Sequence, residues 1–356
     1  MDYTNDETTW FVECREWNEL SQIWKGLYKN NPYMTAYQSY EFLTITGKGW
    51  SDKRPWVLLG LREKNYILYK KGEAIAIAPL LVRRCKNVYY VYFRGTYTSA
   101  GHLDFLYRPD WNYSDFEYLL NWIKGSLGET KFFLDRVSEK SISISFIRKY
   151  FQPNENQIKM SKCVSIPIKD NYNNYFNSLS KSIRQNIRTS YNRLNRNDTK
   201  MDVVVYFNTS IAYEYNVQQE ILKLYCKRMA RKNVRGGPLQ HIVGSLLRIA
   251  KSRNPMLKAM NGISFGFHAL LYIDNNLAAF CRGFLCNDNR IIIPQFSIDS
   301  TYGWFSPGGL LINETIKKLI EKQDEPKIKE FDLSRGAEKY KYAYGGVTHY
   351  NYSFWV

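Results

Sequence analysis

The sequence predicts an α/β (α+β) chain of two similar domains, each with a mixed, mostly antiparallel sheet flanked by helices. Apolar residues make up 44% of the 356 residues and aromatic residues 16%, enough to build large cores. Segments with the two-residue period of a strand alternate with segments of helical period. The order of these segments in the first half recurs in the second, which is typical of a duplicated domain.

The first half begins with helices and continues with strands. Residues 15–50 are predicted as two helices broken at Pro32, because apolar side chains recur at helical spacing. Strands follow in NYILYKKGEAIAIAPLLVRR, which a Lys-Lys-Gly-Glu turn divides, and in NVYYVYFRG. The next segments are the helix YSDFEYLLNWIKGSL, with Ser114 as its expected N-cap, the strand KFFLDRV, the helix SISISFIRKYF and the strand CVSIPI.

The second half repeats this order with longer helices. The predicted elements are one or two helices in YNNYFNSLSKSIRQNIRTSYNRLNR, the strand MDVVVYF, and the helices VQQEILKLYCKRMARK and LQHIVGSLLRIAKS. Short Asn/Asp turns then separate the strands ISFGFHALLYI, LAAFCRGFLC and RIIIPQFSI, which predicts an antiparallel meander. The chain closes with the helix LLINETIKKLIEK, the strand IKEFDLS, the short helix GAEKYKYAYG and the strand VTHYNYSFW. We therefore expect domains at 1–160 and 161–356.

Charge and cysteine usage limit the partners. The net charge of +17 favours a polyanionic partner such as nucleic acid, a phosphorylated cofactor or anionic lipid, although many basic proteins bind none. The six cysteines form no C-x-x-C pair, and the four histidines lack metal-ligand spacing, so no metal is predicted. No signal peptide or membrane-spanning run is recognisable, so we expect a cytoplasmic location, with contact to the inner membrane face as an alternative. Oligomeric state is not predicted.

The loop SPGG at residues 306–309 is the leading candidate for a binding motif. It directly precedes an amphipathic helix, whose N-terminus offers unpaired N–H groups and the positive end of a dipole to a phosphate. The corresponding stretch of the first half, LYRPDWNYSDFEYLL, has no glycine. We predict that Ser306, Gly308, Gly309 and Leu310 bind a pyrophosphate group. The alternative is a Pro-Gly turn that only starts a helix.

This order of elements, with a glycine loop after the third meander strand, resembles the GNAT acyltransferase fold. The sequence is more specifically similar to the CelD/BcsL-like acetyltransferases, in the tandem-GNAT group that also holds the FemABX peptidyltransferases. The stretches that carry this similarity are GEAIAIAPLLVRR, FRGTYTSAGHLDFL, YFNSLSKSIRQNIRTSYNRL, FSPGGLLINETI and FDLSRGAEKYKYAYGG. Between RG and YK the family often has a second acid and a proline; here Ala337, Glu338 and Lys339 stand there, so positions 337 and 339 inherit no role.

The resemblance covers almost the whole chain and implies tandem GNAT domains with the acyl-donor site in the second and a degenerate one in the first. It implies acetyl-CoA or another acyl-CoA as donor, and a sugar, polysaccharide or lipid-linked cell-envelope precursor as acceptor. In this fold two central strands diverge and the thioester lies between them. Asp332, near the end of one such strand, is then a candidate general base, although it could instead cap the next helix and pair with Arg335.

Other residues are expected to help at the same place. Tyr340 is a catalytic candidate, and Tyr302 could donate a proton to the departing thiolate. Arg335 and Lys341 are expected to hold an anionic group of either substrate, and His268 to line the cleft. A basic helix at 180–196, with Ser180 as N-cap and no acidic residue, presents Lys181, Arg184 and Arg188 to a substrate phosphate, tRNA or lipid, unless it is only a solvated face.

The predicted function is an acyl-CoA-dependent N- or O-acyltransferase that transfers the acyl group directly. No G-x-S-x-G or Ser/His/Asp pattern is present, so the rate should come from positioning and from polarising the thioester carbonyl. One alternative is a FemABX-like peptidyltransferase that uses aminoacyl-tRNA. Another is a non-catalytic basic protein that binds polyanions or membranes.

Overall fold

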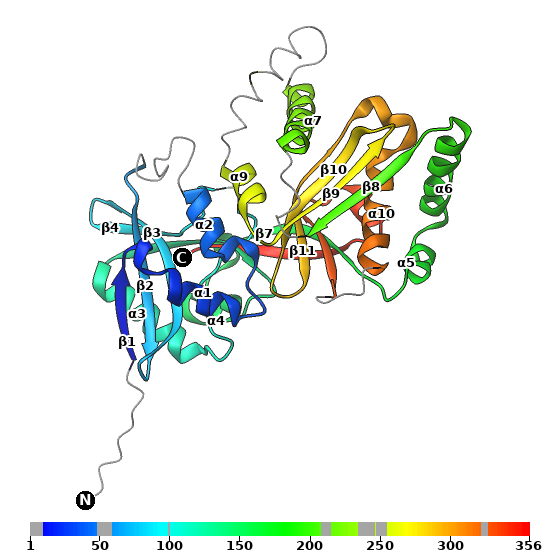
Figure 1. Cartoon of the computed structure of the whole chain (residues 1–356). Helices are drawn as coiled ribbons and strands as arrows, with labels where there is room; N and C mark the ends of the chain where they lie inside the picture. Colours follow the sequence, from blue (N-terminus) through cyan, green and yellow to red (C-terminus); the bar gives the residue numbers. More distant parts are fainter. Residues whose placement is uncertain are drawn as a thin grey trace, which may run out of the picture. The chain divides into compact units, whose positions relative to one another are not determined.

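The computed structural model describes residues 10–47, 59–98, 100–207, 215–233, 246, 255–321 and 327–356 (Figure 1). The chain forms two compact units, one of Met1–Ser161 with Tyr350–Val356 and one of Lys162–His349. Each unit is a mixed sheet with helices against it, so the predicted fold class is confirmed.

The first unit is built on a mainly antiparallel sheet in the order β1-β2-β3-β4-β6-β13. Strands β4 and β6 are parallel, and β13 (Val347–Trp355) runs antiparallel to β6. Its other elements are β1 (Trp10–Arg15), η1 (Trp17–Glu19), α1 (Ser21–Lys29), η2 (Ala36–Gln38), α2 (Tyr40–Gly47), β2 (Arg62–Lys70), β3 (Glu73–Cys85), β4 (Val88–Phe93), β5 (Leu106–Tyr107), α3 (Tyr113–Leu127), β6 (Thr130–Ser138), α4 (Ser143–Phe151) and η4 (Glu155–Gln157).

Two details of this unit differ from the prediction. Strand β1 was not expected, because its segment has no strand alternation of its own and is ordered by pairing with β2, far along the chain. Helix α3 begins at Tyr113 and is capped by Asn112, whose side chain accepts from the Asp115 N–H, and not by Ser114. Asparagine in an extended conformation just before the first turn is the stronger cap.

The second unit has the sheet order β7-β12-β11-β10-β9-β8. The three predicted meander strands are β9, β10 and β11, and Ser180 caps α6 as expected. Its elements are β7 (Ile158–Pro167), α5 (Tyr172–Ser178), α6 (Lys181–Arg196), β8 (Met201–Phe207), α7 (Tyr215–Asn233), α9 (Pro255–Gly262), β9 (Gly266–Ile273), β10 (Asn276–Leu285), β11 (Arg290–Ile298), η5 (Ser300–Phe305), α10 (Pro307–Glu321), β12 (Glu330–Arg335) and α11 (Lys339–Ala343). The helix predicted in LQHIVGSLLRIAKS lies outside the described residues.

The last strand of each repeat pairs within the other unit. Strand β7 ends the first repeat in sequence, yet residues 163–167 pair with β12 of the second unit. Strand β13 ends the second repeat, yet residues 351–355 pair with β6 of the first. The chain therefore passes between the units twice, at 161/162 and at 349/350.

Helices cover both faces of the second unit's sheet. On one face, α5, α6 and α10 bury Tyr175, Ile187 and Leu311 against alternate strand residues such as Ala269 and Leu271. On the other face, α7 packs its own apolar residues against the residues between them, including Leu270 and Phe280. This alternation follows the two-residue period of a strand buried on both sides.

Candidate active site

Strands β11 and β12 pair over only part of their length. They run parallel through three residue pairs, Arg290 with Glu330, Ile291 with Phe331, and Ile292 with Asp332. Strand β11 continues to Ile298, whereas β12 bulges at Ser334, which has a φ of 59°. Across these fully described strands no pair follows Ile292 and Asp332, so an opening begins there.

The direction of the β11 backbone shows which groups face this opening. The Asp299 N–H donates to the Ala278 carbonyl of β10 at 2.7 Å. Because backbone groups alternate along a strand, those of Pro294, Phe296 and Ile298 point away from β10, toward the opening. Pro294 has no N–H and cannot donate to a neighbouring strand, which explains why pairing stops just before it.

Tyr340 lies on the short helix α11, on the far side of the opening. Its ring is 6.3 Å from that of Phe296 between centroids, and 41% of the residue is exposed. Burial of the phenol, together with the nearby Glu338 carboxylate, raises the pKa of Tyr340, against an opposing effect of Arg228. The hydroxyl therefore stays protonated at neutral pH and can donate.

Lys341 was predicted to bind a substrate anion, but the structure gives it another role. The residue is buried, and its Nζ donates to the carbonyls of Ser334 (3.2 Å), Arg335 (3.0 Å) and Gly336 (3.1 Å). The same Nζ lies 3.0 Å from Glu338 Oε2, so the three hydrogens of this ammonium group are shared among four acceptors. Lys341 thus holds the β12 bulge and is not available to a substrate. The guanidinium of Arg335 remains exposed.

Asp332 is fully buried where the paired part of the two strands ends. One carboxylate oxygen accepts from the Ser334 N–H at 2.7 Å. The other lies 3.1 Å from His349 Nε2 and 3.6 Å from Arg290 Nη1. With no exposed atom, this carboxylate cannot contact an acceptor in this conformation. Asp332 supports the turn after β12 and does not cap α11, whose N-cap is Glu338. The ion pairs of Asp332 are with Arg290 and His349 and not with Arg335.

The SPGG loop offers fewer donors than the sequence predicted. Pro307 has no N–H, and the N–H groups of Gly309 and Leu310 both donate to the Ser306 carbonyl, at 3.0 and 3.1 Å. A Cβ on Gly309 would lie 2.1 Å from the Tyr344 hydroxyl, so this glycine is required for packing against α11. The Leu310 side chain is buried in the core. Gly308 is therefore the residue of the first turn whose N–H is not engaged by Ser306.

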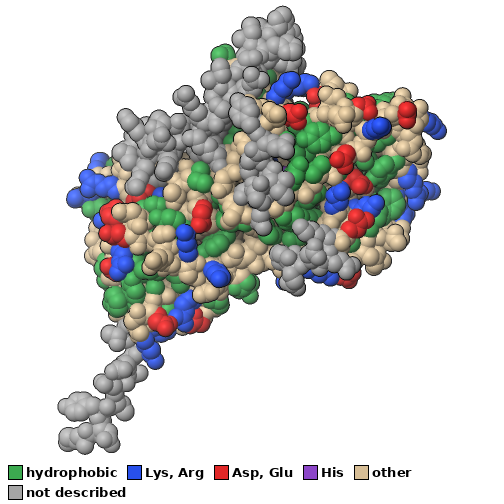
Figure 2. Space-filling model, viewed as in Figure 1, with side chains coloured by type: hydrophobic (Ala, Val, Ile, Leu, Met, Phe, Trp, Pro, Cys, Tyr) green, Lys and Arg blue, Asp and Glu red, His purple; other side chains and the backbone are tan. Residues whose placement is uncertain are grey.

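The basic helix α6 approaches the same loop through a residue that was not among the predicted ligands. Arg193 donates to the Trp304 carbonyl at 2.7 Å and lies over the indole ring at 3.9 Å. Lys181 and Arg188 are exposed farther along α6, and Arg184 is half-buried. On the face shown in Figure 2, basic side chains lie scattered among acidic and apolar ones and do not form one patch.

His268 and Tyr302 lie at opposite sides of the sheet. His268 of β9 is buried on the α7 side, where burial and the charge of Arg282 lower its pKa to about 3, so the imidazole is neutral. Arg282 of β10, which lies opposite His268, donates to Gln295 of β11. This hydrogen bond connects the side chains next to His268 with the strand that borders the opening. Tyr302 is half-buried in η5 against the core under α10. Of the predicted residues, Tyr340 lies next to Phe296 and Gly308 lies next to Ile298, both on the open edge of β11.

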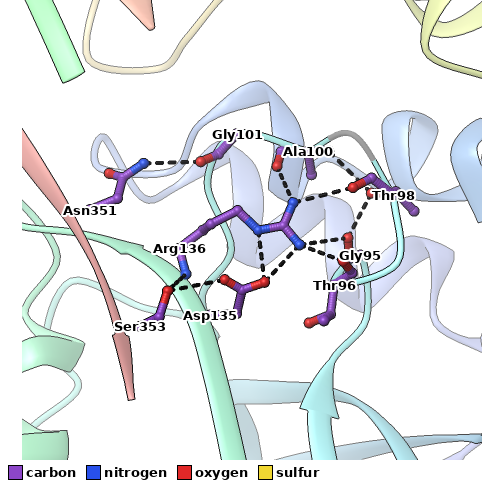
Figure 3. Close-up of polar contacts among 9 residues, drawn as sticks. All are labelled: Gly95, Thr96, Thr98, Ala100, Gly101, Asp135, Arg136, Asn351 and Ser353. Atoms are coloured by element: carbon purple, nitrogen blue, oxygen red, sulfur yellow. Dashed lines mark hydrogen bonds and ion pairs between the residues drawn. The ribbon is translucent and has the colours of Figure 1, made fainter. Parts of the chain in front are cut away.

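In the first unit, the corresponding pair of parallel strands also ends at a bulge, but there Arg136 binds the loop that follows β4 (Figure 3). Strands β4 and β6 pair in parallel from Tyr89 and Thr130 to Tyr92 and Phe133, and β6 then bulges at Arg136, with a φ of 59°. The Arg136 guanidinium donates to carbonyls of the loop after β4 and forms an ion pair with Asp135. The accepting carbonyls belong to Gly95 (3.4 Å), Thr96 (2.5 Å), Thr98 (3.2 Å) and Ala100 (2.5 Å).

Known protein families and solved structures were compared with this chain, and both gave matches. Residues 257–342 match the family model described as an acetyltransferase (GNAT) domain. Among solved structures, the C-terminal domain (DUF2156) of a putative lysylphosphatidylglycerol synthetase from Agrobacterium fabrum aligns with a TM-score of 0.52 and 10% identity, over 96% of this chain and 92% of that chain. It shares the fold. No curated protein matches the chain.

Two further solved structures also align along most of the chain. A tandem GNAT protein from the clavulanic acid biosynthesis pathway has a TM-score of 0.45 and 10% identity, over 97% of this chain and 98% of that chain. FemX gives the same TM-score and identity, over 97% of each chain. The narrower similarity to CelD/BcsL-like enzymes stays a prediction. The match of residues 257–342 to the acetyltransferase (GNAT) model confirms the predicted enzyme class, a GNAT-type acyltransferase, at that level.

Proposed function

We propose that the protein transfers an acyl group from acetyl-CoA, or another acyl-CoA, directly to an amine or hydroxyl of an acceptor. The observation that carries this proposal is the parting of β11 and β12 after Ile292 and Asp332, beside a protonated tyrosine. The open edge of β11 presents the Phe296 N–H and the backbone groups of Ile298, which suits the amide groups of an extended pantetheine chain. The start of α10 at Gly308 suits the pyrophosphate.

Tyr340 is the proposed proton donor of the reaction. The acceptor nitrogen or oxygen bonds to the thioester carbon, the C–S bond breaks, and the sulfur leaves as a thiolate. The Tyr340 hydroxyl can protonate this thiolate, because its raised pKa keeps it in the phenol form. Overall, one proton moves from the acceptor to the sulfur. With Asp332 buried, no described carboxylate is assigned as the base.

The acceptor class rests on the sequence resemblance, which favours a sugar, polysaccharide or lipid-linked precursor. Exposed cations at Lys181, Arg188 and Arg335 are proposed to hold anionic groups of either substrate. Among the described residues, no helix is both long enough and apolar enough to cross a membrane. Contact with an anionic membrane surface stays a prediction.

Calorimetric titration with acetyl-CoA tests the donor site. We expect Gly308→Val to weaken binding about tenfold, since the new side chain would occupy the place given to the pyrophosphate. A Cβ there would lie 3.2 Å from Ile298 Cγ2 and 3.6 Å from the Phe296 ring, with no backbone atom among these nearest neighbours, so a small side-chain shift should preserve the fold. Gly303→Val is the matched control, because nothing lies within 4 Å of its Cβ position in η5.

Two outcomes would count against this function. If neither acetyl-CoA nor a longer acyl-CoA bound the wild-type protein or raised its Tm, the donor class would be wrong. A saturating ligand at 100 times its Kd should add about 2.7 kcal/mol, which a thermal shift detects. If the wild type bound acetyl-CoA and Gly308→Val bound it equally well, the donor would lie elsewhere.

A further inference from the structure

We propose that Arg228 of α7 is a catalytic residue whose guanidinium holds the thioester carbonyl oxygen as it gains negative charge. This inference rests on the proposed acyl transfer. Arg228 follows Ile221 and Leu224 by seven and four residues, so it lies on the same face of α7. The side chains of Ile221 and Leu224 pack against the sheet. The Arg228 side chain, on the same face of the helix, is therefore directed toward β11.

The guanidinium reaches the edge of β11 that borders the opening. Arg228 Nη1 donates to the Phe296 carbonyl and lies 3.5 Å from Ser297 Oγ. The Phe296 carbonyl points away from β10, toward the opening, and the Tyr340 ring lies next to the Phe296 ring. The guanidinium, the phenol and the open strand edge therefore meet at one place. Arg228 comes from the sheet face opposite α10, so it does not compete with the start of α10 for a phosphate.

A cation is useful here because this strand edge is poor in donors. Pro294, two residues past the last pair, has no N–H to offer a carbonyl oxygen. Arginine carries five N–H donors, and the hydrogen bonds of Arg228 use Nη1. Its neighbour Lys227 is paired with Asp299 at 2.8 Å. Within the described parts of the chain, no carboxylate lies at ion-pair distance from Arg228, so its charge is available to a ligand.

The chemistry needs such a donor at one step. When the acceptor attacks the thioester carbon, the π electron pair of the carbonyl moves onto oxygen and leaves one negative charge there. Charge-assisted N–H donors stabilise this oxyanion more than the neutral carbonyl of the ground state. The pair then returns to re-form the carbonyl, the C–S bond breaks, and the thiolate takes its proton from Tyr340. Removing one oxyanion donor typically lowers the rate by about 10²–10³ fold.

A binding experiment tests this role without knowledge of the acceptor. Carboxymethyl-CoA is a stable thioether in which a CH₂ replaces the thioester carbonyl and a carboxylate replaces the methyl group, so it places a negative oxygen next to the position of the carbonyl oxygen. We expect the wild-type protein to bind it about tenfold or more tightly than free CoA. Arg228→Gln should abolish this preference while leaving the Kd of free CoA unchanged, and Arg228→Lys should keep part of it. Arg231→Gln, at an exposed position on α7, is the control.

The rate of acetyl-CoA hydrolysis by water, followed as free thiol, supplies the second measurement. We expect it to fall about 10² fold in Arg228→Gln. If that variant kept both the carboxylate preference and the hydrolysis rate, this inference would be overturned while the proposed function stood. Equal weakening of both ligands with a lower Tm would mean that Arg228 only braces α7 against β11. If the wild type bound neither ligand, the proposed function itself would fail.

Discussion

The two units share one design at the place where their parallel strands end, but they differ in where a cation is directed. In both, the second strand bulges at a residue other than glycine with a φ of 59°, Arg136 in one and Ser334 in the other. In the first unit, Arg136 reaches across to the loop after β4. In the second unit, Lys341 returns to the carbonyls of its own bulge, so it does not fasten the loop after β11. The same bulge thus occurs once with a cation that crosses to the neighbouring loop and once with a cation that stays at the bulge.

A second link reinforces the closure in the first unit. The Asp104 carboxylate, in the segment after that loop, accepts from Ser141, which follows β6, and from the Phe105 N–H at 2.8 Å. The equivalent segments of the second unit, η5 and the turn before α11, have no such carboxylate link among the described residues. The loop after β11 is held instead from α6 and α7, by Arg193 at the Trp304 carbonyl and by Lys227 at Asp299. Because neither link crosses to β12, we propose that acyl-donor binding belongs to the second unit.

The largest expected effect is on the stability of the first unit, when the hydrogen bonds of Arg136 to the loop after β4 are removed. Arg136→Ala leaves four loop carbonyls without their charged donor and Asp135 without its partner, so we expect a loss of about 3–5 kcal/mol in unfolding free energy. Urea denaturation measures it. Arg84→Ala, at an exposed position, should cost about 0.5 kcal/mol or less. An Arg136→Ala loss below about 1 kcal/mol would show that the loop is held by other contacts.

The second effect concerns catalysis in the second unit. Tyr340→Phe should lower kcat for acetyl-CoA turnover by about 10² fold and leave the Kd unchanged, since only the proton donor is lost. Tyr342→Phe is the matched control, because it lies on the same helix with similar exposure and bonds Thr348 at 2.9 Å. Equal rates for the two variants would remove Tyr340 from the mechanism and weaken the contrast between the units.

The sequence predicted most elements because their patterns are local. The meander strands, the N-cap of α6 and the helix after SPGG follow from periodicity and turn residues. The exchange of β7 and β13 could not be predicted, because both strands fit either sheet by their pattern. Their partners are decided by packing between segments far apart in the chain.

The site was predicted less well, for a related reason. Tyr340 and Gly308 are near the opening, but residue type cannot show whether a lysine or an aspartate faces solvent or closes a turn, as Lys341 and Asp332 do. Arg228 was missed because it lies in a helix that reads as an ordinary amphipathic pattern. One signal for such a residue was available in the sequence. Pro294 lies inside a predicted strand, and its missing N–H marks a strand edge that needs a hydrogen-bond donor from elsewhere.

The smallest effect is a difference in pH dependence between the two units. Burial lowers the pKa of His268 to about 3, below its value of about 6.5 in the unfolded chain. The unfolded state therefore binds the proton first as pH falls, and stability is lost below about pH 6.5. Between pH 7 and 5 this costs about 2 kcal/mol. His268→Gln, which cannot charge, should lack that loss when urea unfolding is compared at the two pH values.

Asp104 in the first unit should act in the opposite direction. Burial raises the pKa of its carboxyl to about 6, against the hydrogen bonds from Ser141, Ser143 and Phe105. The folded state then binds more protons than the unfolded state between about pH 4 and 6, so stability falls as pH rises through this range. From pH 5 to 7 the loss is about 1 kcal/mol. Asp104→Asn should remove this slope and leave that of His268. If the slope persisted in Asp104→Asn, the carboxylate would be charged in the fold, and its link to Ser141 would be an ordinary ionic hydrogen bond.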